Sequence, residues 1–120
     1  MTSLFVRSSL LALVAVASTV SFASAKTPYD GRWSLSITTT RGSCDTYNFP
    51  VDITNGHVSF PGLVKANGRV SAKGGVRVFV SAMDKSASGS GRLTTSYGSG
   101  RWSGHSGEDH CSGSWTAQRA

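Results

Sequence analysis

Residues 98–115 carry the side chains with the clearest potential for chemistry. They read GSGRWSGHSGEDHCSGSW, with His105 and His110 on either side of Glu108 and Asp109. Imidazole nitrogens and carboxylate oxygens are ligands of transition metals, so this cluster predicts a surface site for zinc, copper or haem iron. The alternative is a solvated polar turn, because Ser, Gly, Glu and Asp are typical turn residues.

Catalysis is not predicted. Nucleophilic catalysis needs a base within reach of an activated serine or cysteine, and no serine lies in a Gly-x-Ser-x-Gly motif. Four of the six acidic residues are scattered along the chain; they are Asp30, Asp45, Asp52 and Asp84. Paired carboxylates for acid–base chemistry are therefore not indicated. We therefore predict a protein that is not an enzyme, with no catalytic residue and no cofactor.

Four arginines form a second candidate site, a face for an anionic ligand. They are Arg69, Arg77, Arg92 and Arg101. Alternation places them on one face of four consecutive strands, with Arg77 directly opposite Arg92 and Phe79 beside them. Like charges opposite each other destabilise a sheet, and an anionic partner would relieve the repulsion. The alternative is that outward arginines only maintain solubility and discourage edge pairing.

The first 25 residues predict export. They contain one basic residue, Arg7, then an apolar run over residues 10–20, and they end in Ala-Ser-Ala, a pattern typical of a secretory signal peptide. The run is shorter than the roughly 20 residues that a membrane-spanning helix needs. We therefore expect a signal peptide over residues 1–25, a single domain over residues 26–120, no transmembrane segment, and a periplasmic or secreted location.

The expected location limits the partners of the arginine face. In an exported protein of net charge +6, we expect an anionic envelope polysaccharide, a lipid such as lipopolysaccharide, or an acidic protein, rather than nucleic acid. The location also predicts that Cys44 and Cys111 form a disulfide, since disulfides persist in oxidising compartments. The sequence does not indicate an oligomeric state.

Alternating apolar residues predict an all-β fold. The dipeptide Asn55-Gly56 is typical of a two-residue hairpin turn and would pair Ile53 with Val58. A loop over residues 41–43 would pair Leu35 with Phe49. Both registers gather apolar residues on one face, and a slip of one residue would reverse the faces.

Further hairpins are predicted along the rest of the chain. Loops or turns near residues 73–75, 84–85, 97–98 and 106–109 give apolar residues a common face. The predicted opposed pairs are Val70–Val78, Val76–Leu93, Leu93–Trp102 and His105–His110. Residues 60–68 have no unique register, and we expect a longer loop or an irregular edge there.

The strands, about eight in number, form an antiparallel meander, which either closes into a barrel or leaves two exposed edges. If strand direction alternates, Cys44 and Cys111 lie at the same end of the sheet, one after the first strand and one at the last. A disulfide between them makes these strands neighbours, so we expect a closed or nearly closed small barrel. Seven inward apolar residues suggest little free volume; they are Trp33, Leu35, Ile37, Tyr47, Phe49, Trp102 and Trp115.

The tripeptide Gly31-Arg32-Trp33, at the start of the first strand, resembles the Gly-x-Trp signature of the calycin superfamily, which includes lipocalins and avidins. The resemblance implies an eight-stranded up-and-down barrel closed at one end by Trp33. It also implies a basic residue packed over that tryptophan, for which Arg119 is the candidate. No residues match the biotin site of the avidins.

The whole sequence also resembles small exported proteins of rhizobial-type bacteria, which implies a compartment but no particular chemistry. Together these features predict a disulfide-linked barrel that acts as a binding module for an anionic ligand or an envelope component. Two alternatives are a structural envelope-interaction protein without a small ligand, and a surface protein that binds a transition metal or haem.

Overall fold

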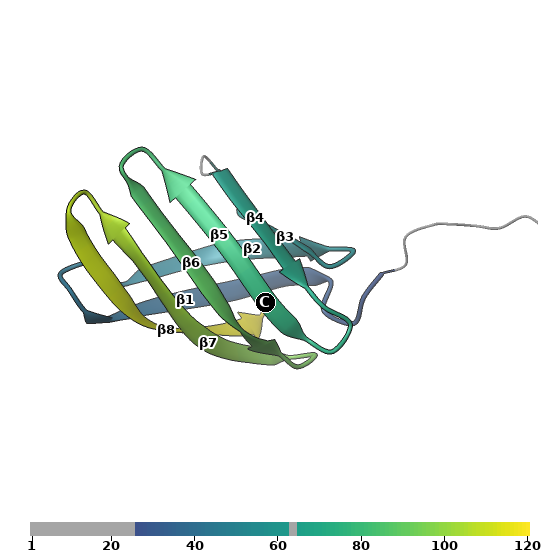
Figure 1. The fold of residues 1–120 in the computed structure, drawn as a ribbon. Coiled ribbons are helices and arrows are strands. Elements are labelled where there is room, and N and C mark those ends of the chain that lie inside the picture. The colour runs from purple at the N-terminus through teal and green to yellow at the C-terminus, as the bar shows by residue number, and fades with distance from the viewer. Residues whose placement is uncertain (1–25, 63–64) are drawn as a thin grey trace, which may run out of the picture.

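The computed structural model describes residues 26–62 and 65–120; the predicted signal peptide lies outside them. The described residues form an all-β barrel of eight antiparallel strands without helices (Figure 1). The strands are β1 (Gly31–Arg41), β2 (Tyr47–Thr54), β3 (His57–Ser59), β4 (Lys65–Val70), β5 (Gly75–Ala82), β6 (Lys85–Leu93), β7 (Tyr97–Ser106) and β8 (Asp109–Arg119). Accordingly, this part of the chain contains no helix that is long and apolar enough to cross a membrane.

The barrel is closed by pairing between the first and last strands, as the sequence predicted. β1 and β8 run antiparallel, from Trp33 opposite Arg119 to Arg41 opposite Ser112, with a shift in register between Thr39 and Arg41. The disulfide joins Cys44, in the loop after β1, to Cys111 in β8, with Cα atoms 6.1 Å apart. Closure gives every strand two neighbours, so no edge strand is left exposed.

The predicted registers at the two ends of the chain are confirmed. Ile53 lies opposite Val58, and Leu35 lies opposite Phe49. Asn55 and Gly56 have φ angles of 53° and 81°, the two positive values that a type I′ hairpin turn requires. In the last hairpin, His105 lies opposite His110.

Three predicted registers in the middle of the chain are wrong. Val70 lies opposite Val76 instead of Val78. Val76 lies opposite Gly91 instead of Leu93, and Leu93 lies opposite Gly98 instead of Trp102. The turns close at other residues than expected, but each shift is an even number of residues. Every side chain therefore stays on its predicted face.

The prediction for residues 60–68 is also wrong in its second half, because Lys65–Val70 forms β4 and pairs with both β3 and β5. A glycine hides this strand in the sequence. A Cβ at Gly68 would lie 2.8 Å from Val78 and 2.9 Å from Val58. The inward position of β4 between two valines therefore has no room for the apolar side chain that would reveal the alternation.

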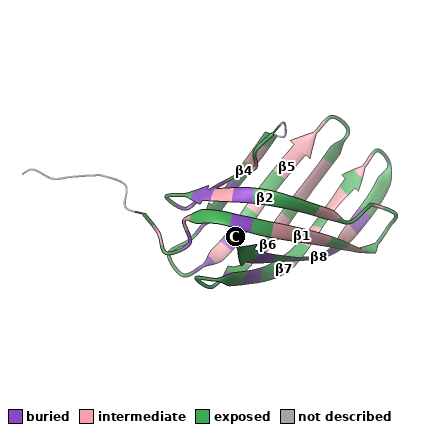
Figure 2. Ribbon diagram, turned by 180° about the vertical axis from the view of Figure 1, so that it is seen from behind, coloured by how far each residue is buried: buried purple, intermediate pink, exposed green. Residues whose placement is uncertain are grey.

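The buried apolar residues lie mainly in one half of the barrel (Figure 2). We call this half the closed end; the connections after β2, β4 and β6 lie there, and those after β1, β3, β5 and β7 lie at the open end. The core consists of Tyr29, Trp33, Val51, Ile53, Val58, Val70, Val76, Leu93, Trp115 and Ala117. Glycines make room for its indole rings: a Cβ at Gly91 or Gly100 would lie 2.6 or 2.7 Å from the Trp115 ring.

Removal of the disulfide tests how much the closed sheet depends on it. The double substitution Cys44→Ser with Cys111→Ser is expected to lower the free energy of unfolding by about 4 kcal/mol, because the crosslink no longer restricts the unfolded chain. Urea denaturation followed by tryptophan fluorescence measures the difference. A thiol reductant should bring the wild-type protein to the same midpoint and leave the double variant unchanged. Equal stability of wild type and double variant without reductant would contradict this expectation.

Candidate functional site

Trp33 and Arg119 seal the closed end of the barrel. The Trp33 side chain is 1% exposed, and its indole N–H donates a hydrogen bond to the carbonyl of Tyr29 at 2.8 Å. The Arg119 guanidinium lies 4.7 Å from the centre of the Trp33 ring, so the predicted contact is confirmed. The same guanidinium donates to the carbonyls of Pro28, Asp30 and Thr95, each at 2.7 Å.

Asp30 fixes the segment before β1 to the turn between β2 and β3. Its carboxylate accepts hydrogen bonds from the Thr27 hydroxyl at 2.6 Å and from the backbone N–H groups of Asn55 and Gly56 at 2.7 and 3.2 Å. Desolvation raises its pKa, but these hydrogen bonds stabilise the charged form more strongly and lower the pKa from 3.8 to about 2. The carboxylate therefore stays ionised and anchors the N-terminal segment across the closed end.

An apolar cavity of about 480 Å³ lies inside the barrel and extends from the open end to the core, since most of the core residues also line it. Its walls include Leu35, Ile37, Phe49, Val80, Ala87 and Trp102. Phe49 remains 37% exposed although it points inward, because the space in front of it is not filled by other side chains. The prediction of little free volume is therefore wrong: the inward apolar residues are those expected, but they do not meet across the open half.

One wall of this cavity is aromatic. The Tyr47 and Phe49 rings are stacked with centroids 5.9 Å apart, and Phe60 meets Phe49 edge-on at 6.2 Å. Pro61 and Lys85 also line the pocket, which extends to residues of the open-end connections. The polar and charged side chains on the lining belong to β5, β6 and β7; they are Ser81, Lys85, Ser86, Ser88, His105 and Ser106. The lining residues of β1 to β4 and β8 are otherwise mainly apolar.

The histidine pair lies at the open end of the barrel, where His105 on β7 is opposite His110 on β8 and His105 also lines the pocket. The His105 and His110 ring centroids are 6.2 Å apart. Asp109 accepts a hydrogen bond from the Ser43 hydroxyl, and this contact joins the loops beside the disulfide. The described part of the chain has no group of three or more His, Cys, Asp or Glu residues that could hold a metal ion. The predicted cluster of His105, Glu108, Asp109 and His110 is therefore brought together only in part, as the two facing imidazoles.

A serine that the sequence analysis did not select lies beside this pair. The Ser86 hydroxyl and His105 Nε2 are 2.9 Å apart, within the range of a nucleophile and its base. Among the described residues, no carboxylate hydrogen-bonds to His105 to orient the ring. The contact depends on the β6–β7 register, which places Ser86 opposite His105; the predicted register would have placed Ser90 there.

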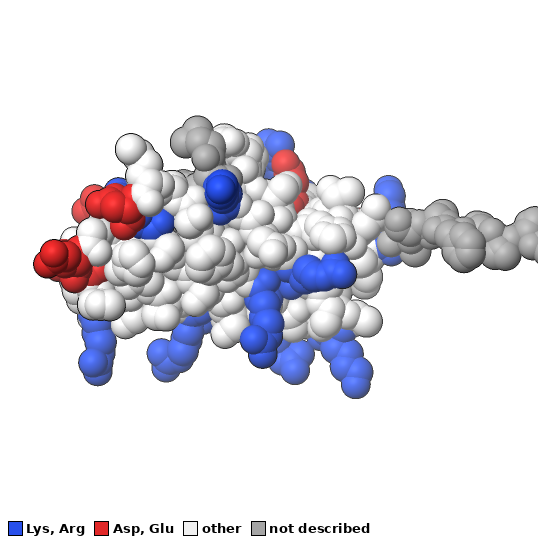
Figure 3. Space-filling model, turned by 45° about the horizontal axis from the view of Figure 1, so that its top comes forward, with Lys and Arg blue, Asp and Glu red and all other residues white. Residues whose placement is uncertain are grey.

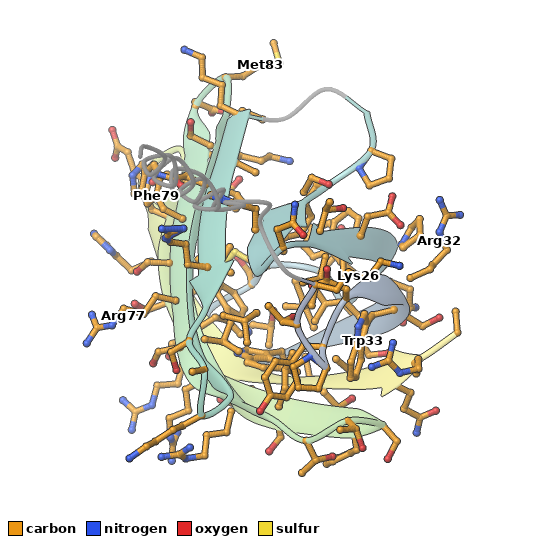
Figure 4. All side chains as sticks on the ribbon, turned by 90° about the vertical axis from the view of Figure 1, so that its right-hand side faces the viewer. Lys26, Arg32, Trp33, Arg77, Phe79 and Met83 are labelled. Atoms are coloured by element: carbon orange, nitrogen blue, oxygen red, sulfur yellow. A yellow bond between two sulfur atoms is a disulfide. The ribbon has the colours of Figure 1, made fainter. Side chains whose placement is uncertain are left out.

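The predicted arginine face lies on the outside of β4 to β7. Arg77 and Phe79 point away from the barrel on one side, and Arg32 points away on the opposite side (Figure 4). A row of basic side chains projects from one side of the molecule, with others elsewhere on the surface, whereas acidic ones gather mainly at one end (Figure 3). Within the described residues, the one ion pair joins Arg32 to Asp52 at 3.1 Å. The face thus carries positive charge without a carboxylate partner.

The register corrects how these arginines are arranged. Arg77 lies opposite Arg69 on one side and Ser90 on the other, so the predicted Arg77–Arg92 opposition is wrong. Ser90 in turn lies opposite Arg101. Arg69, Arg77 and Arg101, which we call the arginine row, therefore lie on one line across β4, β5 and β7.

An open groove of about 750 Å³ runs along the arginine row. Phe79 and Arg41 also line it, whereas Arg92 does not. Instead, Arg92 donates a hydrogen bond to the carbonyl of Lys73 at 3.2 Å. Arg41 belongs to β1, so only the closure of the barrel brings it to this surface, and the order of the strands along the chain gave no signal for it.

The Asp30 hydrogen bonds predict a dependence of stability on pH. The folded-state pKa is lowered, so ionised Asp30 stabilises the fold above about pH 4 and loses this effect as the pH falls towards 2. Asp30→Asn should therefore lower the urea midpoint at pH 7 and have almost no effect at pH 2.

Asp45→Asn is the matched control, because it removes the same charge from an exposed loop residue and should change the midpoint little at either pH. Urea titrations of the three proteins at both pH values measure these differences. A deficit of Asp30→Asn that is as large at pH 2 as at pH 7 would show that the carboxylate charge is not responsible.

No protein-family model, curated protein or solved structure matches this chain. The calycin resemblance therefore stays a prediction from the sequence motif.

Proposed function

We propose that this chain is an exported, non-catalytic binding module that holds an apolar molecule, or the apolar part of an amphipathic one, inside its barrel. The observation that carries the proposal is the cavity of about 480 Å³ inside the barrel. Its volume lies within the range of roughly 300–1,000 Å³ that is usual for small-molecule sites.

The chemistry of the walls selects the class of ligand. Most of the side chains that line the cavity are aliphatic or aromatic, and no charged group is buried among the described residues. Transfer of an uncompensated charge into such surroundings is strongly unfavourable, whereas burial of apolar surface is favourable. A polar group of the ligand would therefore stay near the open end, where Lys85 and Ser106 line the pocket.

The contrast between the two halves of the barrel supports binding rather than a purely structural role. The closed end is sealed by Trp33 under Arg119, and the core residues next to it line the inner end of the cavity, which supports a preformed site that opens at the other end. A preformed site loses little conformational freedom on binding. The disulfide supports export, because such bonds persist in oxidising compartments.

The absence of catalysis is part of the proposal. Ser86 and His105 form the one contact between a hydroxyl and an imidazole that we find in the described residues, and both residues lie on the lining of the pocket towards its open end. A catalytic pair needs a substrate position beside it and an oriented base. Among the described residues no carboxylate hydrogen-bonds to His105 and orients its ring, so the pair lacks the third group of a catalytic triad, and we propose binding rather than catalysis.

An uncharged fluorescent probe tests the proposed function. N-phenyl-1-naphthylamine should bind with a fluorescence increase that saturates at one molecule per chain. Ala87→Phe should weaken this binding about tenfold, because the new ring occupies the cavity beside Val80, the cross-strand neighbour of Ala87. Sodium chloride at 0.5 M should not weaken the binding, since apolar burial is not screened by salt.

Thr116→Phe is the matched control, because Thr116 is exposed on β8 and lies opposite Ser99 and Ser36. It adds the same ring to the outside of the barrel and should leave probe binding unchanged. No saturable binding to the wild type, or equal losses in the two variants, would contradict the proposed function and favour a structural role.

A further inference from the structure

We propose that the arginine row, together with Phe79 and Arg41, binds a linear anionic polysaccharide on the outer surface of the barrel. This site is separate from the cavity, because the residues of the row point to the other side of the sheet. It concerns a second ligand of different chemistry, so it holds whether or not the cavity binds an apolar molecule.

The spacing of the positive charges favours an extended ligand with repeating charge. Neighbouring strands lie about 4.8 Å apart, so the backbone positions of Arg69 and Arg77 on adjacent strands are about 5 Å apart. Those of Arg77 and Arg101, with Ser90 between them, are about 10 Å apart. A chain that crosses the strands along the groove would thus meet one guanidinium after another.

Among the described residues, no carboxylate forms an ion pair with the arginine row. Four of the six acids of the chain lie at the open end; they are Asp45, Asp84, Glu108 and Asp109. Arg69 donates a hydrogen bond to Nε2 of His57 at 3.3 Å, a partner that is not an anion. Arg69 and Arg77 face each other directly, an arrangement that destabilises the free protein and that a bound anion would neutralise.

The surface between the arginines has the chemistry of a carbohydrate site. Hydroxyl and amide groups line the groove; they belong to Thr40, Asn67, Ser88, Ser90, Ser103 and Ser112. Such groups can exchange hydrogen bonds with sugar hydroxyls. Phe79 is 51% exposed and lies between Asn67 and Ser88 on the neighbouring strands, where it offers a flat apolar surface to one face of a sugar ring.

Other macromolecules fit this surface less well. The core of a protein interface is rich in aromatic and apolar side chains, and a single-strand nucleic-acid site stacks successive bases on several aromatic rings. A lipid surface requires apolar side chains that can enter the membrane. Phe79 is the one outward aromatic residue that lines the groove, so charge and hydroxyl groups dominate its chemistry.

Affinity electrophoresis and calorimetry with polygalacturonate test the proposal, with uncharged dextran as the neutral polymer. The wild-type protein should bind polygalacturonate at 20 mM NaCl and not bind dextran. Binding should weaken about tenfold or more at 300 mM NaCl, because each contact with a guanidinium is screened. Comparable binding to dextran would overturn the proposal, as would binding to polygalacturonate that does not change with salt.

A pair of variants with equal net charge separates the groove from general electrostatic attraction. Arg69→Ser with Arg77→Ser removes two positive charges from the groove, whereas Lys73→Ser with Arg92→Ser removes two from residues that do not line it. The first double variant should weaken binding at least tenfold, and the second by less than about threefold. Equal losses in the two variants would overturn the proposed site.

Three further measurements test the stacking contact, the identity of the ligand and the independence of the site. Phe79→Ser should weaken polygalacturonate binding several-fold without a change in the thermal midpoint, and an unchanged affinity would remove the stacking contact from the proposal.

Duplex DNA and vesicles with anionic lipid should bind more weakly than polygalacturonate at equal ionic strength. If either binds as tightly, the face is a general polyanion surface and the proposed specificity is wrong. The Arg69→Ser, Arg77→Ser variant should still bind N-phenyl-1-naphthylamine, since the cavity is intact.

Discussion

The pairing of β1 with β8 closes the sheet, and both candidate sites depend on it. Without this seam the meander would have two edges, and the inner face would be open to water rather than enclosed. The disulfide holds the seam at one end, where it joins Cys44 to Cys111. At the other end, Arg119 on β8 lies opposite Trp33 on β1 and its guanidinium covers the indole. A covalent bond and a cation–π contact thus fix the two ends of one strand pair.

Closure places alternate side chains of each strand either inside the barrel or on its water-exposed outer surface. Inward residues meet one another in the closed half, where glycines such as Gly91 and Gly100 let the Trp115 ring lie against the backbone. Farther along the same strands the inward side chains no longer fill the space, and the cavity opens. The barrel is therefore sealed at one end and open at the other, and the apolar cavity between them rests on the core residues.

The arrangement of charges on the outer surface depends on the register between strands. Its arginines are spaced by the distance between strands rather than along any one strand, so they form a row only when the registers align them. Arg41 lines the same groove although it belongs to β1, which is far from β7 in the sequence. The two sites therefore use opposite faces of the same strands, one for apolar contact and one for charge, and substitutions can address them separately.

Much of this architecture was determined by the sequence itself. Alternating apolar residues fixed which face each side chain occupies, and the Asn55-Gly56 turn fixed the register of its hairpin. Even the registers predicted wrongly left Arg69, Arg77 and Arg101 outward, because the errors were even numbers of residues. The positions of the two cysteines predicted the neighbouring first and last strands correctly.

Only the tertiary structure decided which residues lie beside one another and how much space the barrel encloses. Arg77 faces Arg69 rather than Arg92, and Ser86 rather than Ser90 lies beside His105. Turn geometry sets these registers, and the residues of the turns are compatible with more than one register. The free volume depends on how the inward side chains of all eight strands meet across the barrel. That is a property of the closed sheet as a whole, and no local pattern of residues specifies it.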